Sequence, residues 1–214
     1  EVYTQSRTNA LPKWRGVTVP ARREFMLKQG PSRNIVTMDW TTIWAINKRM
    51  LDPVVPRFMA IEEKDVVTVT LTGGPEKSYK EERPKHVKNP EVGTKQVTFG
   101  PKLLLDQADV ASFDDNEEIT LMSWGNAIVR GLDKSAAPIK ELKLELNLAG
   151  DFKATSKKVH WLAADPENLV KAELWDFDYL ITKDTLEKND NLDDFLADVT
   201  ATKTNALVDA NISN

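Results

Sequence analysis

The feature of this 214-residue chain that most constrains its fold is a change of sequence period within residues 40–61. Up to Leu51, apolar side chains recur every three or four residues, which is the spacing of one face of an α-helix. The following Asp52-Pro53 predicts the end of this helix, because the proline ring disfavours helical geometry in the residue before it. From residue 58 onwards the chain turns extended. The sequence therefore predicts a helical front part followed by β-strands.

The front part of the chain is expected to form two basic helices. The first spans residues 21–29, between the cap Thr18 and the stop signal Gly30-Pro31. The second spans residues 40–51, with Asp39 as its cap. Its buried stripe is expected to comprise Trp40, Ile43, Trp44, Asn47 and Leu51. Aromatic rings at this spacing are more often core residues than platforms for RNA bases, and the sequence leaves both interpretations of the two tryptophans open.

Beyond residue 61 the pattern predicts a mainly β fold. Apolar residues alternate with threonine over residues 67–72 and with charged residues over 140–148, as in strands with one buried face. The expected strands are 67–72, 95–99, 102–106, 118–122, 126–130, 140–148, 157–162, 171–175 and 178–182. Short strands with few helices between them favour antiparallel barrels or sandwiches. A charged loop is expected at 76–90 and a late helix at 191–198, whereas the tail from 199 is weakly patterned.

Charge is distributed unevenly along the chain. Residues 1–60 hold 10 Lys and Arg against 4 Asp and Glu, whereas residues 108–214 hold 11 against 21, within a total net charge of −4. Local basic patches matter more for nucleic-acid binding than the total charge. The side chains that would line an RNA backbone are Arg22, Arg23, Lys28, Arg33, Lys48, Arg49 and Arg57. The alternative is that those on the helices only solvate the outer helix faces.

The sequence offers no motif for catalysis, metal binding or cofactor binding. It has no cysteine, no P-loop and no G-x-G-x-x-G pattern, and its two histidines lack metal-ligand spacing. The acidic run 114–118 lacks the spaced ligands and the turn glycine of a calcium loop. We therefore expect no catalytic residue, no metal site and no cofactor in this chain, and neither a membrane span nor a secretory signal.

Seven stretches within roughly residues 16–212 form longer motifs. They are TVPARREFMLKQGPSRNIV, MDWTTIWAINKRMLDPVVPRFMAI, HVKNPEVG, LMSWGNAIV, LNLAGDFKAT, VHWLA and DFDYLITKDTLE. In this order they resemble the eukaryotic cytosolic glutamyl-tRNA synthetases, at the junction of their catalytic and anticodon-binding parts. Pro56-Arg57 and residues 89–91 are also shared with the glutaminyl-tRNA synthetases, whereas residues 29–33, 40–45 and 123–126 look like the glutamyl branch.

The resemblance implies a short helical region followed by two antiparallel β-barrels, one proximal and one distal. The expected domains are an irregular lead-in at 1–17, a helical connector at 18–56 and a two-barrel region at 57–214, of which about 57–106 and 163–214 are proximal and about 107–162 distal. The catalytic domain of the family has no counterpart here, and family members continue past residue 212. We therefore expect a part of a longer class I enzyme, inactive alone.

The resemblance also implies the function. The chain is expected to bind the anticodon arm of glutamate tRNA within a cytoplasmic glutamate–tRNA ligase, with ATP and Mg²⁺ used by the longer protein and no cofactor held here. The expected partner is tRNA, and neither DNA nor a membrane. One alternative is a protein-interaction module for other proteins of a multi-synthetase complex. Another is the glutaminyl-specific relative.

Among the site residues, the resemblance gives a role to Arg57. In the glutaminyl relatives, the arginine of the Pro-Arg element contacts an anticodon base, and a guanidinium fork suits hydrogen bonding to a base edge. Asn126 is the second expected base contact, whereas Thr120 stands where those relatives carry a base-reading arginine. The residues expected to contact the RNA backbone are Arg22, Arg23, Arg33, Lys48, Arg49, Lys85 and Lys88.

Overall fold

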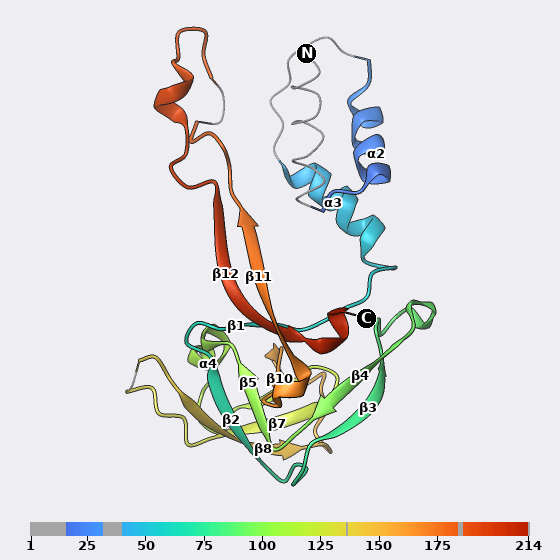
Figure 1. Cartoon of the computed structure of the whole chain (residues 1–214), viewed down its shortest axis with the longest axis vertical. Helices are drawn as coiled ribbons and strands as arrows, with labels where there is room; N and C mark the ends of the chain where they lie inside the picture. Colours follow the sequence, from blue (N-terminus) through green and yellow to red (C-terminus); the bar gives the residue numbers. More distant parts are fainter. Residues whose placement is uncertain (1–15, 32–39, 136, 184–185, 214) are drawn as a thin grey trace. The chain divides into compact units, whose positions relative to one another are not determined.

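The computed structural model describes residues 16–31, 40–135, 137–183 and 186–213 (Figure 1). The fold is mainly β, as the sequence predicts, and its two longer helices precede the strands. No helix in these ranges is long and apolar enough to cross a membrane. Most of the predicted lead-in, the predicted cap Asp39 and the predicted RNA contact Arg33 lie outside the described residues.

The helices of the described chain are α2 (Val19–Gln29), α3 (Trp40–Leu51) and α4 (Gln107–Ser112). The strands are β1 (Ala60–Glu62), β2 (Val67–Thr72), β3 (Tyr79–Pro84), β4 (Thr94–Phe99), β5 (Lys102–Leu105), β6 (Glu118–Leu121), β7 (Gly125–Arg130), β8 (Glu141–Asn147), β9 (Lys158–Val159), β10 (Leu162–Ala163), β11 (Leu169–Phe177) and β12 (Ala201–Asp209). Short 3-10 turns are η1 (Pro90–Val92), η2 (Pro166–Asn168), η3 (Leu192–Phe195) and η4 (Ala210–Ser213).

Helix α2 begins and ends at the predicted signals. The Thr18 hydroxyl accepts a hydrogen bond from the Ala21 N–H at 3.3 Å, and Pro20 occupies the first turn. Gly30 ends the helix with a φ of 72°, a backbone conformation that glycine adopts without strain, and its N–H donates to the Leu27 carbonyl. The prediction of this helix is confirmed, with a start two residues earlier than expected.

Helix α3 has the predicted bounds, but its buried face differs in part from the predicted stripe. Ile43, Ile46 and Asn47 are buried, whereas Trp44 is 37% exposed. Ile43 and Ile46 pack with Val17, Ala21 and Phe25 into one small core. Trp44 is therefore not part of the buried face, which includes Ile46 because α2 packs against that side of α3.

The larger part of the β structure is a curled seven-stranded sheet with the order β10-β5-β2-β8-β7-β6-β9. Most neighbouring strands are antiparallel, as predicted. Two pairs are parallel, β2 with β8 and β6 with β9, and this corrects the prediction of antiparallel pairing throughout. Two strands that are joined by a tight hairpin must be antiparallel. Neither of these two pairs is joined in this way, so each can pair in parallel.

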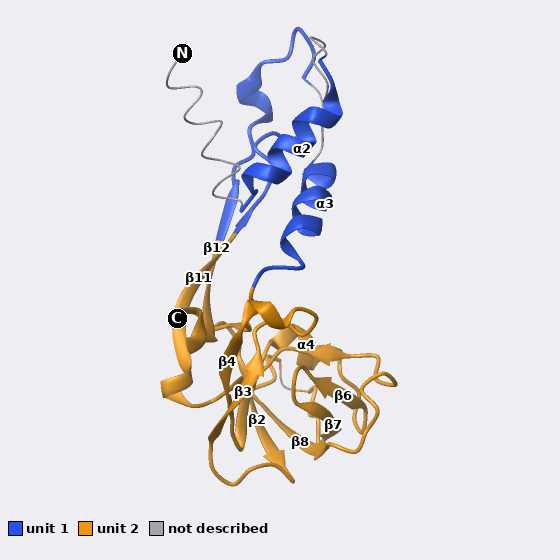
Figure 2. Ribbon diagram, turned by 90° about the vertical axis from the view of Figure 1, so that its right-hand side faces the viewer, with its two compact units in different colours: residues 1–55, 176–202 blue, residues 56–175, 203–214 orange. Residues whose placement is uncertain are grey.

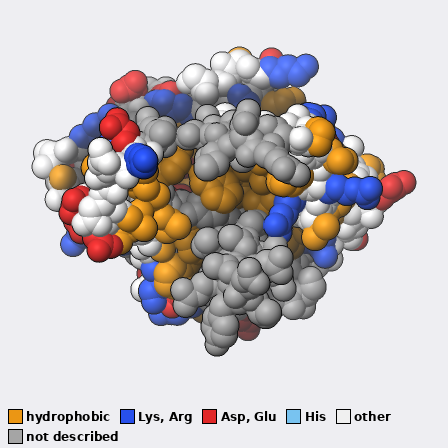
Figure 3. Space-filling view, turned by 90° about the horizontal axis from the view of Figure 1, so that it is seen from above, with side chains coloured by type: hydrophobic (Ala, Val, Ile, Leu, Met, Phe, Trp, Pro, Cys, Tyr) orange, Lys and Arg blue, Asp and Glu red, His pale blue; other side chains and the backbone are white. Residues whose placement is uncertain are grey.

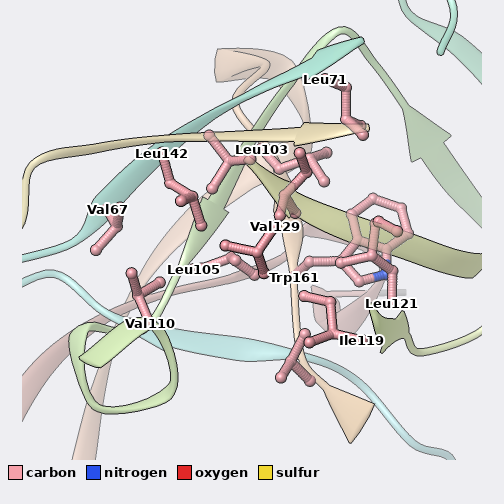
Figure 4. Close-up of a cluster of buried hydrophobic side chains, with 14 of the residues drawn as sticks. Val67, Leu71, Leu103, Leu105, Val110, Ile119, Leu121, Val129, Leu142 and Trp161 are labelled. Carbon is pink, nitrogen blue, oxygen red and sulfur yellow. The ribbon is translucent and has the colours of Figure 1, made fainter. Parts of the chain in front are cut away.

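The curled sheet encloses one hydrophobic core, which the alternating patterns anticipated. Val67 and Val69 of β2 point inward with Leu142 and Leu144 of β8, and all four are buried. Figure 4 shows Val67, Leu142 and Trp161 converging on this interior. The Trp161 indole N–H donates to the Met122 carbonyl at 2.8 Å, so the polar atom of this buried ring is satisfied. The alternation predicted for residues 140–148 is thus confirmed for the middle of that strand.

The strand predicted at 157–162 is divided into β9 and β10, and four other segments depart further from their sequence prediction. The predicted loop at 76–90 contains β3, which forms an antiparallel hairpin with β4, because its charged side chains alternate on a largely exposed ribbon. The predicted strand at 178–182 is reduced to a single bridge between Ile181 and Leu196, and the predicted helix at 191–198 is the short turn η3. The tail instead forms β12, which pairs with β1 and β11.

The chain divides into two compact units (Figure 2). The first contains residues 1–55 and 176–202, and the second contains residues 56–175 and 203–214. The division between residues 55 and 56 falls where the sequence period changes. Strands from both sides of residue 107, the expected border between two barrels, share the seven-stranded sheet of the second unit.

Candidate nucleic-acid interface

Arg57 lies in the extended segment that precedes β1, and its side chain is exposed. Its peptide groups are hydrogen-bonded on both sides. The Arg57 N–H donates to the Lys85 carbonyl at 2.8 Å, and the Arg57 carbonyl accepts from the Lys95 ammonium at 2.9 Å. The main chain is therefore fixed where the side chain leaves it.

The loop after β3 brings two further predicted residues near Arg57. Lys85 is half-buried, and its N–H donates to the Gly93 carbonyl at 2.8 Å. Lys88 is exposed, and its N–H donates to Nδ1 of the buried His86 at 3.1 Å. The Asn89 side chain caps η1 by accepting from a backbone N–H. The structure thus gathers Arg57, Lys85 and Lys88 around one braced loop of the second unit.

Lys95 is the residue of this region that sequence reasoning missed. Its ammonium lies 3.0 Å from the Asp209 carboxylate, and both side chains are at least nine-tenths buried. The two residues are 114 positions apart in sequence. A lysine in a predicted strand and an aspartate in a weakly patterned tail give no signal that they pair.

The basic helices form a separate group in the first unit. Arg22, Arg23 and Lys48 are exposed. Arg49 instead contacts both carboxylate oxygens of Glu24 at 2.6 Å, and Lys28 contacts the same carboxylate. Hydrogen bonds from these two cations hold the pKa of Glu24 below its ordinary value. The Arg49 guanidinium is therefore already engaged in an ion pair with Glu24.

The expected base contact at Asn126 does not agree with the structure, and we withdraw it. Asn126 is 1% exposed on β7. Its amide donates to the Glu118 carboxylate at 3.1 Å and accepts from the Thr120 hydroxyl at 2.9 Å. Thr120 is itself buried, so neither residue presents a group to a ligand at the surface. Asn126, Thr120 and Glu118 instead form hydrogen bonds with one another within the sheet.

Neither tryptophan of α3 is fully buried. Trp40 packs against the helical core, and its ring lies 5.9 Å from that of Trp44, centroid to centroid. Both line an open hollow of the first unit, together with Thr41, Phe177, Asp178 and Tyr179. Figure 3 shows Lys and Arg side chains scattered among acidic and hydrophobic ones where the described residues form the visible face.

Residues 55–147 match the family described as "tRNA synthetases class I (E and Q), anti-codon binding domain". The matched segment begins two residues before Arg57 and contains Lys85, Lys88 and Lys95. This segment therefore belongs to the anticodon-binding domains of the class I tRNA synthetases for glutamate and glutamine.

The chain is also similar, over most of its length, to curated glutamate–tRNA ligases. A protein of Schizosaccharomyces pombe named "Probable glutamate--tRNA ligase, cytoplasmic" is 50% identical over 94% of this chain and 28% of its own length. The cytoplasmic glutamate–tRNA ligase of Saccharomyces cerevisiae is 40% identical over the same shares. A bifunctional glutamate/proline–tRNA ligase of Mus musculus is 37% identical over 85% of this chain and 12% of its own length. The chain spans less than a third of the length of each of these relatives.

Proposed function

We propose that this chain binds the anticodon arm of glutamate tRNA as part of a longer glutamate–tRNA ligase. The observation that carries the proposal is Arg57, an exposed arginine on a main chain hydrogen-bonded from both sides, within the segment that matches the family. A guanidinium held in this way can hydrogen-bond the edge of an unpaired base while stacking on its neighbour. Arg57 is thus our proposed base contact.

The other basic residues are proposed to contact the RNA backbone. Lys85 is hydrogen-bonded to Arg57 through its carbonyl and Lys88 lies in the same loop as Lys85, whereas Arg22, Arg23 and Lys48 lie exposed on the helices. Arg33 and Arg49 complete the proposed set, the latter in competition with its ion pair to Glu24. Each phosphate contact releases counterions and makes the affinity depend on salt. The ATP and Mg²⁺ that the longer ligases use are proposed to act outside this chain, and the names of the relatives support a cytoplasmic location.

The two expected barrels are also retained as a proposal, with revised membership. The seven-stranded sheet and its core support the assignment of their strands to one barrel. The separate β1-β12-β11 sheet supports the assignment of these strands to the other barrel. This assignment differs from the expected border at residue 107, because β2 and β5 share a sheet with β8 and β7.

Titration of the chain with fluorescently labelled glutamate tRNA tests the proposal. Arg57→Ala is expected to weaken cognate binding by about 1–3 kcal/mol and to reduce discrimination against an anticodon-swapped tRNA. Arg130→Ala is the matched control, because Arg130 is a partly exposed arginine of the same unit that pairs with Glu145. Equal discrimination by the parent chain and the Arg57→Ala variant would show that Arg57 does not read a base.

A second candidate function is docking of another protein of a multi-synthetase complex. Exposed apolar side chains on residues 176–202 favour it, among them Tyr179, Leu192, Leu196 and Val199. The bifunctional name of the mouse relative places a similar segment in one chain with a second synthetase. Pull-down at high salt after nuclease treatment tests this function, since an association that RNA bridges is lost under these conditions.

A further inference from the structure

We infer that Lys95 is a positioning residue for Arg57 and thereby a determinant of which unpaired RNA base the domain accepts. The inference rests on the proposed function and extends it to a residue that does not itself contact RNA. It starts from the three groups that surround one buried ammonium.

The Lys95 ammonium has a defined set of partners. It donates to the Arg57 carbonyl at 2.9 Å and to the Asp209 carboxylate at 3.0 Å, and it lies 5.2 Å from the centre of the Phe58 ring. Lysine has three donors and no acceptor, so two of its hydrogens are committed to these oxygens. With the Arg57 N–H bonded to the Lys85 carbonyl, the residue is held through both of its peptide groups.

Asp209 is in turn fixed by the end of β12. Its N–H donates to the Met59 carbonyl at 3.1 Å, and its carboxylate accepts from both the backbone and the side chain of Asn211. Asn211 also exchanges two hydrogen bonds with the backbone of Gln96, the neighbour of Lys95. Three segments that are distant in sequence, 57–59, 95–96 and 209–211, are thus interlocked around one ion pair.

Positioning of the Arg57 peptide explains this ion pair better than a gain in folding stability does. Burying two charges costs desolvation energy, and an apolar pair of similar volume is often as stable or more so. What an apolar pair lacks is a donor for the Arg57 carbonyl. Binding groups need to be held within about 0.5 Å of their productive geometry. The buried ammonium meets this need by tethering the peptide from which the Arg57 side chain extends.

The test removes the tether without leaving an unpaired charge in the interior. Lys95→Met alone would leave the buried Asp209 carboxylate without a cation. The informative variant is therefore Lys95→Met combined with Asp209→Asn. Methionine keeps the apolar stem, and asparagine keeps an acceptor for Asn211. Lys102→Met is the matched control, because Lys102 is an exposed lysine at the start of β5.

The first measurement is amide hydrogen exchange in the full 214-residue chain, which needs no RNA. Exchange reports the local opening of a hydrogen bond. In the double variant, the Arg57 amide is expected to lose about tenfold or more of its protection, while the amides of β2 keep theirs. Parent-like protection of Arg57 in the double variant would overturn the inference, whatever the domain binds.

The second measurement is discrimination between cognate and anticodon-swapped tRNA over a range of salt. The double variant is expected to lose discrimination as Arg57→Ala does, but with an unchanged salt slope, because no surface cation is removed. Discrimination equal to that of the parent would overturn the inference. A parent chain that does not discriminate would instead refute the proposed function, and the exchange measurement would still decide the role of Lys95.

Discussion

Asn47 is predicted to hold the two helices of the first unit together. Its amide oxygen accepts from the Thr18 N–H at 2.9 Å and from the Thr18 hydroxyl at 3.0 Å, and its amide nitrogen donates to the Gly16 carbonyl at 3.0 Å. Asn47 itself is 4% exposed. Each of the two bonds to Thr18 is expected to contribute about 1 kcal/mol, and stranding half-buried donors adds to the cost of losing them. The Gly16 carbonyl is at an exposed residue, where water can replace its partner.

The Asn47→Ala variant is therefore expected to lose about 2–3 kcal/mol of the free energy of unfolding of this unit. The measurement is urea denaturation followed by the helix signal in far-UV circular dichroism. Thr42→Ala is the control, since Thr42 is exposed on the same helix and such surface changes stay within about 0.5 kcal/mol. The reasoning is refuted if Asn47→Ala shifts the unfolding free energy no more than Thr42→Ala does.

Two further predictions concern carboxylates. Glu24→Gln removes the charge that pairs with Arg49, so tRNA affinity is expected to rise and the salt dependence of binding to steepen by up to about one unit of slope. Glu167→Gln is the neutral control, and an unchanged slope in Glu24→Gln would show that Arg49 does not contact the RNA. Burial raises the pKa of Asp106, against the hydrogen bond it accepts from the Glu62 N–H. The native state then binds this proton more tightly than the unfolded state does, so the stability of the parent falls as the pH rises through the ordinary value of 3.8 and the raised pKa. The difference in urea midpoint should accordingly move in favour of Asp106→Asn from acid to neutral pH, and a pH-independent difference would contradict this.

Local sequence rules predicted the parts of the fold in which neighbouring residues decide the backbone. Thr18 and Gly30 bound the first helix, and the second helix ends before Pro53. The alternation over residues 67–72 gave β2 its bounds. Caps, prolines and alternating burial act within a few residues, and therefore they are visible in a single sequence.

The same rules failed where the partner of a segment lies far along the chain. The hairpin strand β3 looked like a charged loop, because an exposed ribbon buries little on either face. Asn126 looked available for RNA until the structure placed it against Glu118 and Thr120. An asparagine in a strand has the same sequence pattern whether its amide faces solvent or a buried acid.

By itself, the sequence determined the order of helix and strand, the basic front part and the resemblance that pointed to an anticodon-binding region. The tertiary structure decided which charged side chains are exposed and which form ion pairs within the chain. Arg49 is engaged by Glu24, and Lys95 is buried against Asp209 beneath the peptide of Arg57. The physical reason is that composition fixes how many charges a chain carries, whereas their pairing depends on contacts between elements, which join residues 25 positions apart in the helices and 114 positions apart in the strands.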